Sequence, residues 1–207
     1  MTARRRYRRP SARNQLRIIG GRWRGRRIEF PDAEGLRPTA DRVRETLFNW
    51  LQGPLPGARC LDLFAGSGAL GLEAASRGAG EVVLVEAAPA VAAALSASVA
   101  RLGAEHVDVL HIDAQRYLQG NPEPFDIVFL DPPFAQDAQG ALLETLSGCG
   151  WLAHEAWIYL EYPADRPLPA LPGGMELHRH QRAGQAAYAL LRWTASDGTD
   201  GGAEVDE

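Results

Sequence analysis

From residue 58 onward the sequence alternates between short apolar segments and helix-like segments, and this alternation constrains the fold more than any other feature. Each apolar segment has the length and the β-branched and aromatic content of a buried strand. Strands that alternate with helices form a parallel sheet that is covered by helices on both faces. The expected strands are 59–64, 81–86, 107–113, 125–131 and 155–162, with helices after the first strand, near 88–103 and near 139–149.

Both ends of this alternating region add antiparallel elements. Residues 175–193 predict two final strands that turn at Ala183-Gly184, which completes a mostly parallel seven-stranded sheet. Residues 15–30 contain two strand-like stretches broken by glycines, which indicates an N-terminal β-hairpin. The sequence therefore predicts an α/β fold with helices on both faces of the sheet, preceded by a hairpin and a helix.

Charge is divided unevenly along the chain. The first 44 residues carry 14 arginines and 4 acidic residues, whereas the remainder carries 8 arginines and 22 acidic residues. We expect a disordered arginine-rich arm at 1–14, one folded domain at 15–194 with its hairpin at 15–35, and a disordered acidic tail at 195–207. A basic end on an acidic body indicates a polyanionic partner.

The composition excludes several classes of protein. No apolar run approaches the roughly 20 residues of a membrane span, and the charged N-terminus lacks the apolar core of a secretory signal. The two cysteines, Cys60 and Cys149, lack metal-type spacing, and the five histidines are scattered. We therefore expect a soluble cytoplasmic protein that binds no metal.

The stretch DIVFLDPPF (126–134) ends a buried strand abruptly with a carboxylate and two prolines. Proline donates no hydrogen bond to a sheet, and it restricts both its own φ and the residue before it. We therefore expect Asp131, the carbonyl of Pro132 and the ring of Phe134 to lie rigidly at the carboxyl edge of the sheet. Ligands of open parallel sheets bind at that edge.

A glycine turn, Gly66-x-Gly68-x-x-Gly71, follows the strand 59–64 and lets the backbone approach a ligand closely. Glu86 ends the next strand, where an acid can bind both hydroxyls of a ribose. Sites for nicotinamide, flavin and S-adenosylmethionine share these features. Asp62, just before the turn, would repel a pyrophosphate but attract an ammonium group, so S-adenosylmethionine is the favoured cofactor.

The chain resembles the bacterial RsmD family in three motifs, LDLFAGSGALGLEAASRGAGEVVLVE, DPPF and RPTADRVRETLFNWL. The resemblance spans roughly residues 15–193 and includes RAGQAAYALL near the end, whereas the arm and the tail lie outside it. The glycine motif alone is unspecific, but its combination with RPT and DPPF is specific. The resemblance implies a Rossmann-like class I methyltransferase fold. It also implies transfer of a methyl group from S-adenosylmethionine to N2 of a guanine, guanine 966, in 16S ribosomal RNA.

Individual residues acquire roles from the same resemblance. Asp113 is similar to the family's contact to the adenine amino group, although its position also suits a helix N-cap. Arg37 and Thr39 resemble a motif that closes over the cofactor, although Thr39 could instead cap the next helix, with Asp41 in its first turn. Tyr188 resembles a residue of the family's last hairpin, but core packing is an equal alternative. The implied cofactor contacts are Arg37, Thr39, Asp62, Phe64, Ala65, Gly66, Gly68, Glu86, Asp113 and Ala114.

The expected chemistry needs neither a metal nor a covalent nucleophile. An exocyclic amino group is a poor nucleophile because its lone pair is delocalised into the base. Asp131 and the Pro132 carbonyl can accept its two N–H bonds, hold it in line with the methyl group and favour charge on the nitrogen. Phe134 is expected to stack on the target base, and Pro133 to contact the RNA.

The expected partner is 16S ribosomal RNA, within the small ribosomal subunit or its assembly intermediate, and the protein is expected to be a monomer. An adenine-N6 methyltransferase is one alternative, because an Asp-Pro-Pro-aromatic motif also serves that chemistry. A non-catalytic RNA-binding assembly factor is another, and a nicotinamide dehydrogenase is disfavoured by the lack of a catalytic constellation. The arginines expected to bind RNA are Arg22, Arg24, Arg26 and Arg27.

Overall fold

The structure is a computed structural model that describes residues 14–32, 39–133 and 138–195. Two expected site residues, Arg37 and Phe134, lie outside the described residues, as do most of the expected arm and almost all of the expected tail. Asn14, which the sequence places at the end of the arm, instead begins the first strand.

The described residues form nine strands and five helices. The strands are β1 (Asn14–Arg17), β2 (Arg27–Phe30), β3 (Arg59–Asp62), β4 (Glu81–Glu86), β5 (Val107–His111), β6 (Phe125–Leu130), β7 (Leu152–Pro163), β8 (Met175–Ala183) and β9 (Ala186–Thr194). The helices are α1 (Asp41–Trp50), α2 (Gly71–Ser76), α3 (Pro89–Leu102), α4 (Ala114–Leu118) and α5 (Gln139–Gly148). Within these ranges no helix is long and apolar enough to cross a membrane.

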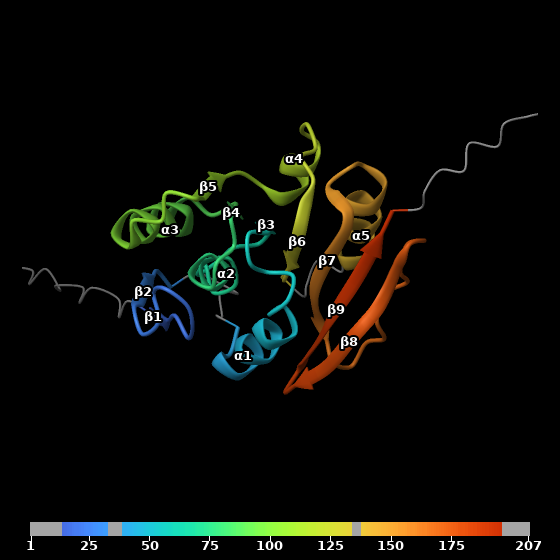
Figure 1. The fold of residues 1–207 in the computed structure, drawn as a ribbon, viewed down its shortest axis with the longest axis horizontal. Coiled ribbons are helices and arrows are strands. Elements are labelled where there is room, and N and C mark those ends of the chain that lie inside the picture. Colours follow the sequence, from blue (N-terminus) through green and yellow to red (C-terminus); the bar gives the residue numbers. More distant parts are fainter. Residues whose placement is uncertain (1–13, 33–38, 134–137, 196–207) are drawn as a thin grey trace, which may run out of the picture.

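Seven strands form one sheet in the order β5-β4-β3-β6-β7-β9-β8 (Figure 1). The first five of these run parallel, and β9 and β8 are antiparallel to their neighbours. The chain enters at β3, moves outward to β5, and then crosses back to β6 on the other side of β3. Such a reversal of strand order opens a crevice at the carboxyl ends of the two central strands. The predicted fold class is confirmed.

The sheet separates two hydrophobic clusters, as the alternation along β6 illustrates. Ile127 and Phe129 join the cluster formed with α1, α2, α3 and the hairpin, whereas Val128 and Leu130 join the cluster formed with α4 and α5. Helices therefore cover both faces, and the hairpin adds a further layer over one of them. Figure 1 shows the hairpin near α3 at one end of the molecule and β8 at the other end.

Three strand boundaries differ from the sequence prediction by two residues or more. The strands β3 and β5 each end two residues earlier than expected, at Asp62 and His111. Strand β7 begins at Leu152 rather than 155, because the register with β6 shifts between Phe125 and Ile127 and allows Leu152 to pair with Phe125. Asp62 is thus the last residue of β3, and its carboxylate lies at the carboxyl end of that strand.

The predicted N-cap at Thr39 is wrong. Ala40 occupies the N-cap position of α1, and no side chain caps the helix. Asp41 does lie in the first turn, as expected, but its carboxylate accepts a hydrogen bond of 2.6 Å from Arg44 Nη2. The buried guanidinium of Arg44 therefore supplies the partner that fixes the start of α1.

The predicted hairpin is confirmed, with β1 and β2 antiparallel over four residue pairs. Its connecting loop is fastened to α2 through the buried carboxylate of Glu73, which accepts hydrogen bonds from the backbone N–H groups of Ile19 and Gly20, both at 2.8 Å. The same carboxylate accepts a hydrogen bond from Arg44 Nη1 at 3.3 Å and one from Arg77 Nε at 2.7 Å. Glu73 therefore joins the hairpin loop, α1 and α2 at one buried point.

Candidate active site

Four carboxylates form a row along the carboxyl edge of the sheet, one on each of four neighbouring strands. Glu86 ends β4, Asp62 ends β3, Asp131 follows β6, and Glu161 lies near the end of β7. The register places Asp62 beside Phe129, two residues before Asp131. Three of these acids were predicted as site residues, whereas Glu161 was not.

The glycine turn between β3 and α2 has the backbone geometry that only glycine adopts without strain. Gly66 and Gly68 have φ values of 51° and 78°, in the left-handed region. A Cβ atom on Gly68 would also lie 2.6 Å from Leu72 Cδ1. A Cβ atom on Gly71 would lie 2.2 Å from Leu84 Cδ2, so α2 packs directly on β4. The turn therefore lets the chain pass closely between β3, β4 and α2, with Gly66 its half-buried glycine.

Glu86 also holds this turn in place. Its carboxylate accepts one hydrogen bond from the backbone N–H of Gly66 at 2.9 Å and another from that of Ala88 at 2.7 Å. A carboxylate has about four lone-pair sites, so two remain for further donors such as a ribose diol. Glu86 can thus shape the glycine turn and bind a ligand at once.

Asp62 is a buried carboxylate, 2% exposed, at the base of the turn. It accepts a hydrogen bond of 2.9 Å from the backbone N–H of Gly71. Burial, and to a smaller extent the nearby charge of Glu86, raises the pKa of Asp62 from 3.8 to about 7. A cation placed beside Asp62 would offset this penalty on the charged form, because opposite charges favour ionisation. These residues fit a cofactor that carries both a ribose and a cationic amino-acid group, as S-adenosylmethionine does.

Asp113 is the N-cap of α4, one of the two roles that the sequence left open. Its Oδ1 accepts hydrogen bonds from the backbone N–H groups of Gln115 at 2.9 Å and Arg116 at 3.2 Å. The side chain is exposed and follows β5, so it lies at the edge where the parallel strands end. Capping and ligand binding are compatible, because the cap uses one of the two carboxylate oxygens.

The remaining expected cofactor contacts differ in exposure. Ala65 and Ala114 are buried, whereas Phe64 and Thr39 are half-buried. Phe64 packs against the cluster on the α4 and α5 side of the sheet. Phe64 and Ala65 follow β3, and Ala114 begins α4 after β5, so all three lie near the carboxyl edge of the sheet.

Asp131 directly follows the buried strand β6, and Pro132 is buried while Pro133 is exposed. Burial, followed by the nearby charges of Glu161 and Asp62, raises the pKa of Asp131 well above that of an ordinary aspartate. A carboxylate with a raised pKa beside a ligand crevice is typical of a functional site. Asp131, whose position was predicted from DPPF, therefore lies between Asp62 of β3 and Glu161 of β7 in the row of carboxylates.

Aromatic side chains line the region beside Glu161. The ring of Tyr188 lies 5.6 Å from that of Trp50 and 6.1 Å from that of Tyr159. Tyr188 is 3% exposed, so it packs in the core, and its hydroxyl donates a hydrogen bond of 2.7 Å to Gln181 Oε1. The Tyr159 hydroxyl donates a hydrogen bond of 2.9 Å to Glu161 Oε2.

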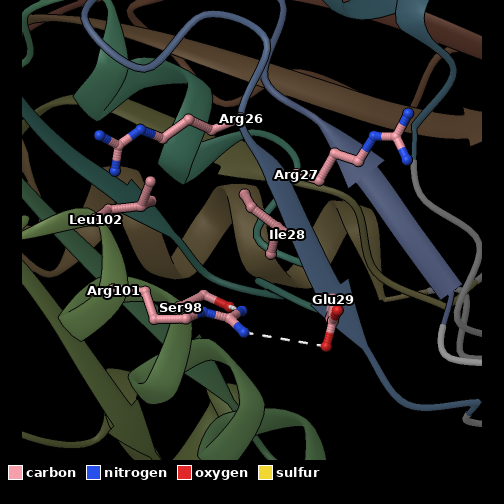
Figure 2. A pocket seen from close by; sticks show the side chains of 7 residues that line it. All are labelled: Arg26, Arg27, Ile28, Glu29, Ser98, Arg101 and Leu102. Atoms are coloured by element: carbon pink, nitrogen blue, oxygen red, sulfur yellow. Dashed lines mark hydrogen bonds and ion pairs between the residues drawn. The ribbon is translucent and has the colours of Figure 1, made fainter.

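The hairpin presents its arginines to solvent. Figure 2 shows Arg26 extending toward Leu102 of α3, and Arg27 extending the other way. Between β2 and α3 lies a cleft of about 270 Å³, which Arg101 of α3 also lines, 4.0 Å from the carboxylate of Glu29. Sequence reasoning missed Arg101 because a single arginine near a helix C-terminus is ordinary. All four predicted arginines are exposed: Arg22, Arg24, Arg26 and Arg27.

Comparisons with known proteins agree over nearly the whole folded region. The sequence model of the family described as Conserved hypothetical protein 95 matches residues 16–192. Ribosomal RNA small subunit methyltransferase D of Escherichia coli K12 is 47% identical over 190 residues, which cover 92% of this chain and 96% of that protein. The protein of the same name from Haemophilus influenzae is 40% identical over 187 residues, covering 88% and 96%. The solved structure of yhhF from Escherichia coli superposes with a TM-score of 0.83 at 46% identity, covering 88% of this chain and 99% of that one.

Proposed function

This chain belongs to the family of ribosomal RNA small subunit methyltransferase D, and we propose that it methylates the exocyclic N2 of one guanine in 16S ribosomal RNA with S-adenosylmethionine as donor. The observation that carries the proposal is the row of Glu86, Asp62 and Asp131 at the carboxyl edge of β4, β3 and β6. The first two fit the cofactor, and the third lies where an acceptor nitrogen would meet the methyl group.

The proposed cofactor site assigns one part of the ligand to each element. Glu86 binds the ribose hydroxyls, and Asp62 faces the cationic amino-acid group. The exposed carboxylate of Asp113 binds the adenine amino group, between walls formed by Phe64, Ala65 and Ala114. Arg37 and Thr39 close over the ligand from the segment before α1, although Arg37 lies outside the described residues. When bound, S-adenosylmethionine supplies a methyl group on a positively charged sulfur.

The proposed chemical step depends on Asp131 and the carbonyl of Pro132, which accept the two N–H bonds of the guanine amino group. The nitrogen lone pair forms the new N–C bond as the C–S bond breaks, and that bonding pair stays on sulfur. The methylated nitrogen then carries a positive charge and loses one proton to Asp131, whose raised pKa suits it to accept that proton before solvent takes it. Phe134 stacks on the base and Pro133 contacts the RNA beside it.

The proposed RNA interface is the basic end of the molecule. The exposed hairpin arginines, joined by Arg101, contact phosphates and so fix the position of the RNA without reading its sequence. The arm at 1–14 adds positive charge before the domain at 15–194, and the tail at 195–207 follows it. The partner is the small ribosomal subunit or its assembly intermediate.

We also propose that the protein acts as a monomer in the cytoplasm, where small subunits are assembled. Within the described ranges the exposed large apolar side chains are Leu110 and Leu177. These two leave little apolar surface for a permanent subunit interface. Sedimentation of the purified protein at micromolar concentration tests the oligomeric state.

The decisive experiment transfers labelled methyl groups to small subunits that lack the modification and identifies the product nucleoside. We expect N2-methylguanosine. Recovery of N6-methyladenosine would support the adenine-N6 alternative instead. Failure to bind S-adenosylmethionine in calorimetry would support a non-catalytic assembly factor.

A first prediction concerns the cofactor. Glu86→Ala is expected to weaken S-adenosylmethionine binding about ten- to a hundredfold, the loss typical of a hydrogen bond to a charged group. Calorimetry on the folded variant measures the change, and Glu105→Ala, an exposed acid before β5, serves as the control. Unchanged affinity in Glu86→Ala would place the ribose elsewhere.

A second prediction concerns the hairpin. The double variant Arg24→Glu/Arg26→Glu is expected to weaken binding to small subunits. It should also flatten the slope of log affinity against log salt by about 1.5, since each lost phosphate contact removes about 0.7–0.9. The matched control is Arg179→Glu/Arg182→Glu, because both side chains are exposed and belong to β8, the edge strand on the opposite side of the sheet from β5. Equal slopes for the two variants would remove the hairpin from the RNA interface.

A further inference from the structure

Glu161 interrupts an otherwise apolar part of β7, between the buried residues Leu160 and Tyr162. Leu160 pairs with Leu130, the last residue of β6, so Glu161 lies level with Asp131 on the neighbouring strand. On its other side Glu161 pairs with Tyr188 of β9. The side chain therefore lies at the same sheet edge as Asp131, one strand further from the glycine turn.

The placement of Glu161 beside Asp131 is electrostatically costly. Glu161 is half-buried, burial raises its pKa, and its charge helps to raise the pKa of Asp131. Two carboxylates held side by side favour a ligand that brings hydrogen-bond donors or positive charge to both of them. Costly arrangements of this kind persist mainly where they serve a ligand.

The donors of guanine match these acceptors. On its Watson–Crick edge the N1–H group is adjacent to the two hydrogens of the N2 amino group, so three donors lie in a row. Adenine presents an acceptor at N1, which a carboxylate would repel. Enzymes that act on a base taken out of its stack read this edge by hydrogen bonds.

We propose that Glu161 accepts a hydrogen bond from guanine N1–H, while Asp131 and the Pro132 carbonyl accept the two N2 hydrogens, and that Glu161 thereby selects guanine. This inference rests on the proposed function, because it concerns the base whose N2 is methylated. Glu161 is then a specificity-determining residue, and the aromatic side chains of Tyr188 and Trp50 border its surroundings.

Glu161 could instead serve only to satisfy the buried hydroxyl of Tyr159, which donates to Oε2 at 2.9 Å. The two roles separate in Glu161→Gln. The amide oxygen of glutamine still accepts the tyrosine hydrogen bond, whereas its NH₂ group cannot accept from N1–H. A purely structural role predicts little change in this variant, and the proposed role predicts a change in base preference.

The test compares small subunits whose 16S RNA carries either guanine or 2-aminopurine at the target position. 2-Aminopurine keeps the reactive amino group but has an acceptor at N1. We expect the wild-type protein to prefer guanine in kcat/KM by about ten- to a hundredfold, the loss typical of a hydrogen bond to a charged group. In Glu161→Gln we expect this preference to fall at least tenfold, because the amide NH₂ can donate to N1 of 2-aminopurine, with unchanged S-adenosylmethionine affinity in calorimetry.

Two controls accompany the test. Tyr159→Phe removes the hydroxyl but leaves Glu161, so it should keep the preference for guanine. Glu155→Gln changes an exposed acid on the same strand and should alter nothing. If Glu161→Gln keeps the wild-type preference while wild-type protein makes N2-methylguanosine, this inference is overturned and the proposed function stands. If wild-type protein makes no N2-methylguanosine, the proposed function fails and this inference fails with it.

Discussion

Replacement of Asp131 by alanine is expected to lower the single-turnover rate of methyl transfer about a hundred- to a thousandfold, while the affinity for S-adenosylmethionine changes little. The rate loss follows because a preorganised group aimed at developing charge contributes about this factor. The affinity is preserved because Asp62 and Glu86, not Asp131, lie against the glycine turn. Rapid-quench measurement with prebound small subunits gives the rate, and calorimetry gives the affinity.

Asp131→Asn sharpens this test, since it removes the charge but keeps one acceptor oxygen. We expect an intermediate rate. Asp108→Ala on β5, an exposed aspartate away from the crevice, serves as the control. Single-turnover methylation by Asp131→Ala within a few-fold of the wild-type rate would show that Asp131 does not act on the nucleophile.

The pH dependence of the same step follows from the raised pKa of Asp131. The ionised carboxylate accepts the N–H bond, and it is present only above its pKa. The rate should therefore rise with pH through a range higher than that of an ordinary aspartate, and fall as the pH drops below it. Because the charge of Glu161 contributes to this shift, Glu161→Gln should move the pH profile toward lower pH. A profile that does not move would mean that another group controls it.

The second large effect is expected on stability. Glu73→Ala should lower the free energy of unfolding by about 3–5 kcal/mol, the usual consequence of removing one partner from a buried ion pair. The substitution leaves the guanidinium of Arg44 buried, with both side chains of this pair 0% exposed in the native protein. It also deprives the N–H groups of Ile19 and Gly20 of their acceptor. Urea unfolding followed by circular dichroism measures the change.

Glu155→Ala supplies the matched control for Glu73→Ala, because Glu155 pairs with Arg192 on the surface, with side chains 64% and 40% exposed. An exposed pair contributes about 0–1 kcal/mol, so this variant should unfold almost as the wild type does. If Glu73→Ala does not fold, Glu73→Gln is measured in its place, because its amide oxygen keeps one of the two acceptors that Ile19 and Gly20 use in the native protein. In folded Glu73→Ala protein, hydrogen exchange at Ile19 and Gly20 should be faster than in the wild type, because both N–H groups have lost their acceptor. A loss below 1 kcal/mol would show that the hairpin is held by other contacts.

The sheet could be predicted because its strands are short apolar runs between helices, and such runs have few ways to pack. The position of Asp131 at the end of a strand could be predicted as well, because Pro132 and Pro133 cannot donate hydrogen bonds to the sheet and so end the strand. The start of strand β7 could not be predicted, because Leu152 pairs with Phe125 of β6 only across a register shift. The N-cap prediction at Thr39 failed because the helix starts one residue later, with Ala40 at the N-cap position, and Asp41 of the first turn pairs with Arg44 of the same helix.

Glu73 and Glu161 show what the sequence does not reveal. Glu73 lies in the segment GLEAAS, and from the sequence alone an acid in such a helical segment is expected to be exposed to solvent. Its burial results from a loop more than 50 residues earlier in the chain, which folds over α2. Glu161 becomes noticeable only when the register brings β7 beside Asp131. Both residues acquire their roles from contacts between distant segments, which a local pattern does not encode.

The attachment of the hairpin through Glu73 affects how a single nucleotide could be chosen. Glu73 belongs to α2, the helix that begins at Gly71 of the glycine turn. The hairpin loop and the glycine turn are therefore joined through one helix. A flexible tether would let the arginines hold RNA at many distances from the methyl donor. The rigid joint fixes the distance between the arginines and the methyl donor. Only a guanine at that distance from the bound phosphates would then reach the methyl group. A variant with a loosened joint should then bind RNA but methylate more than one guanine.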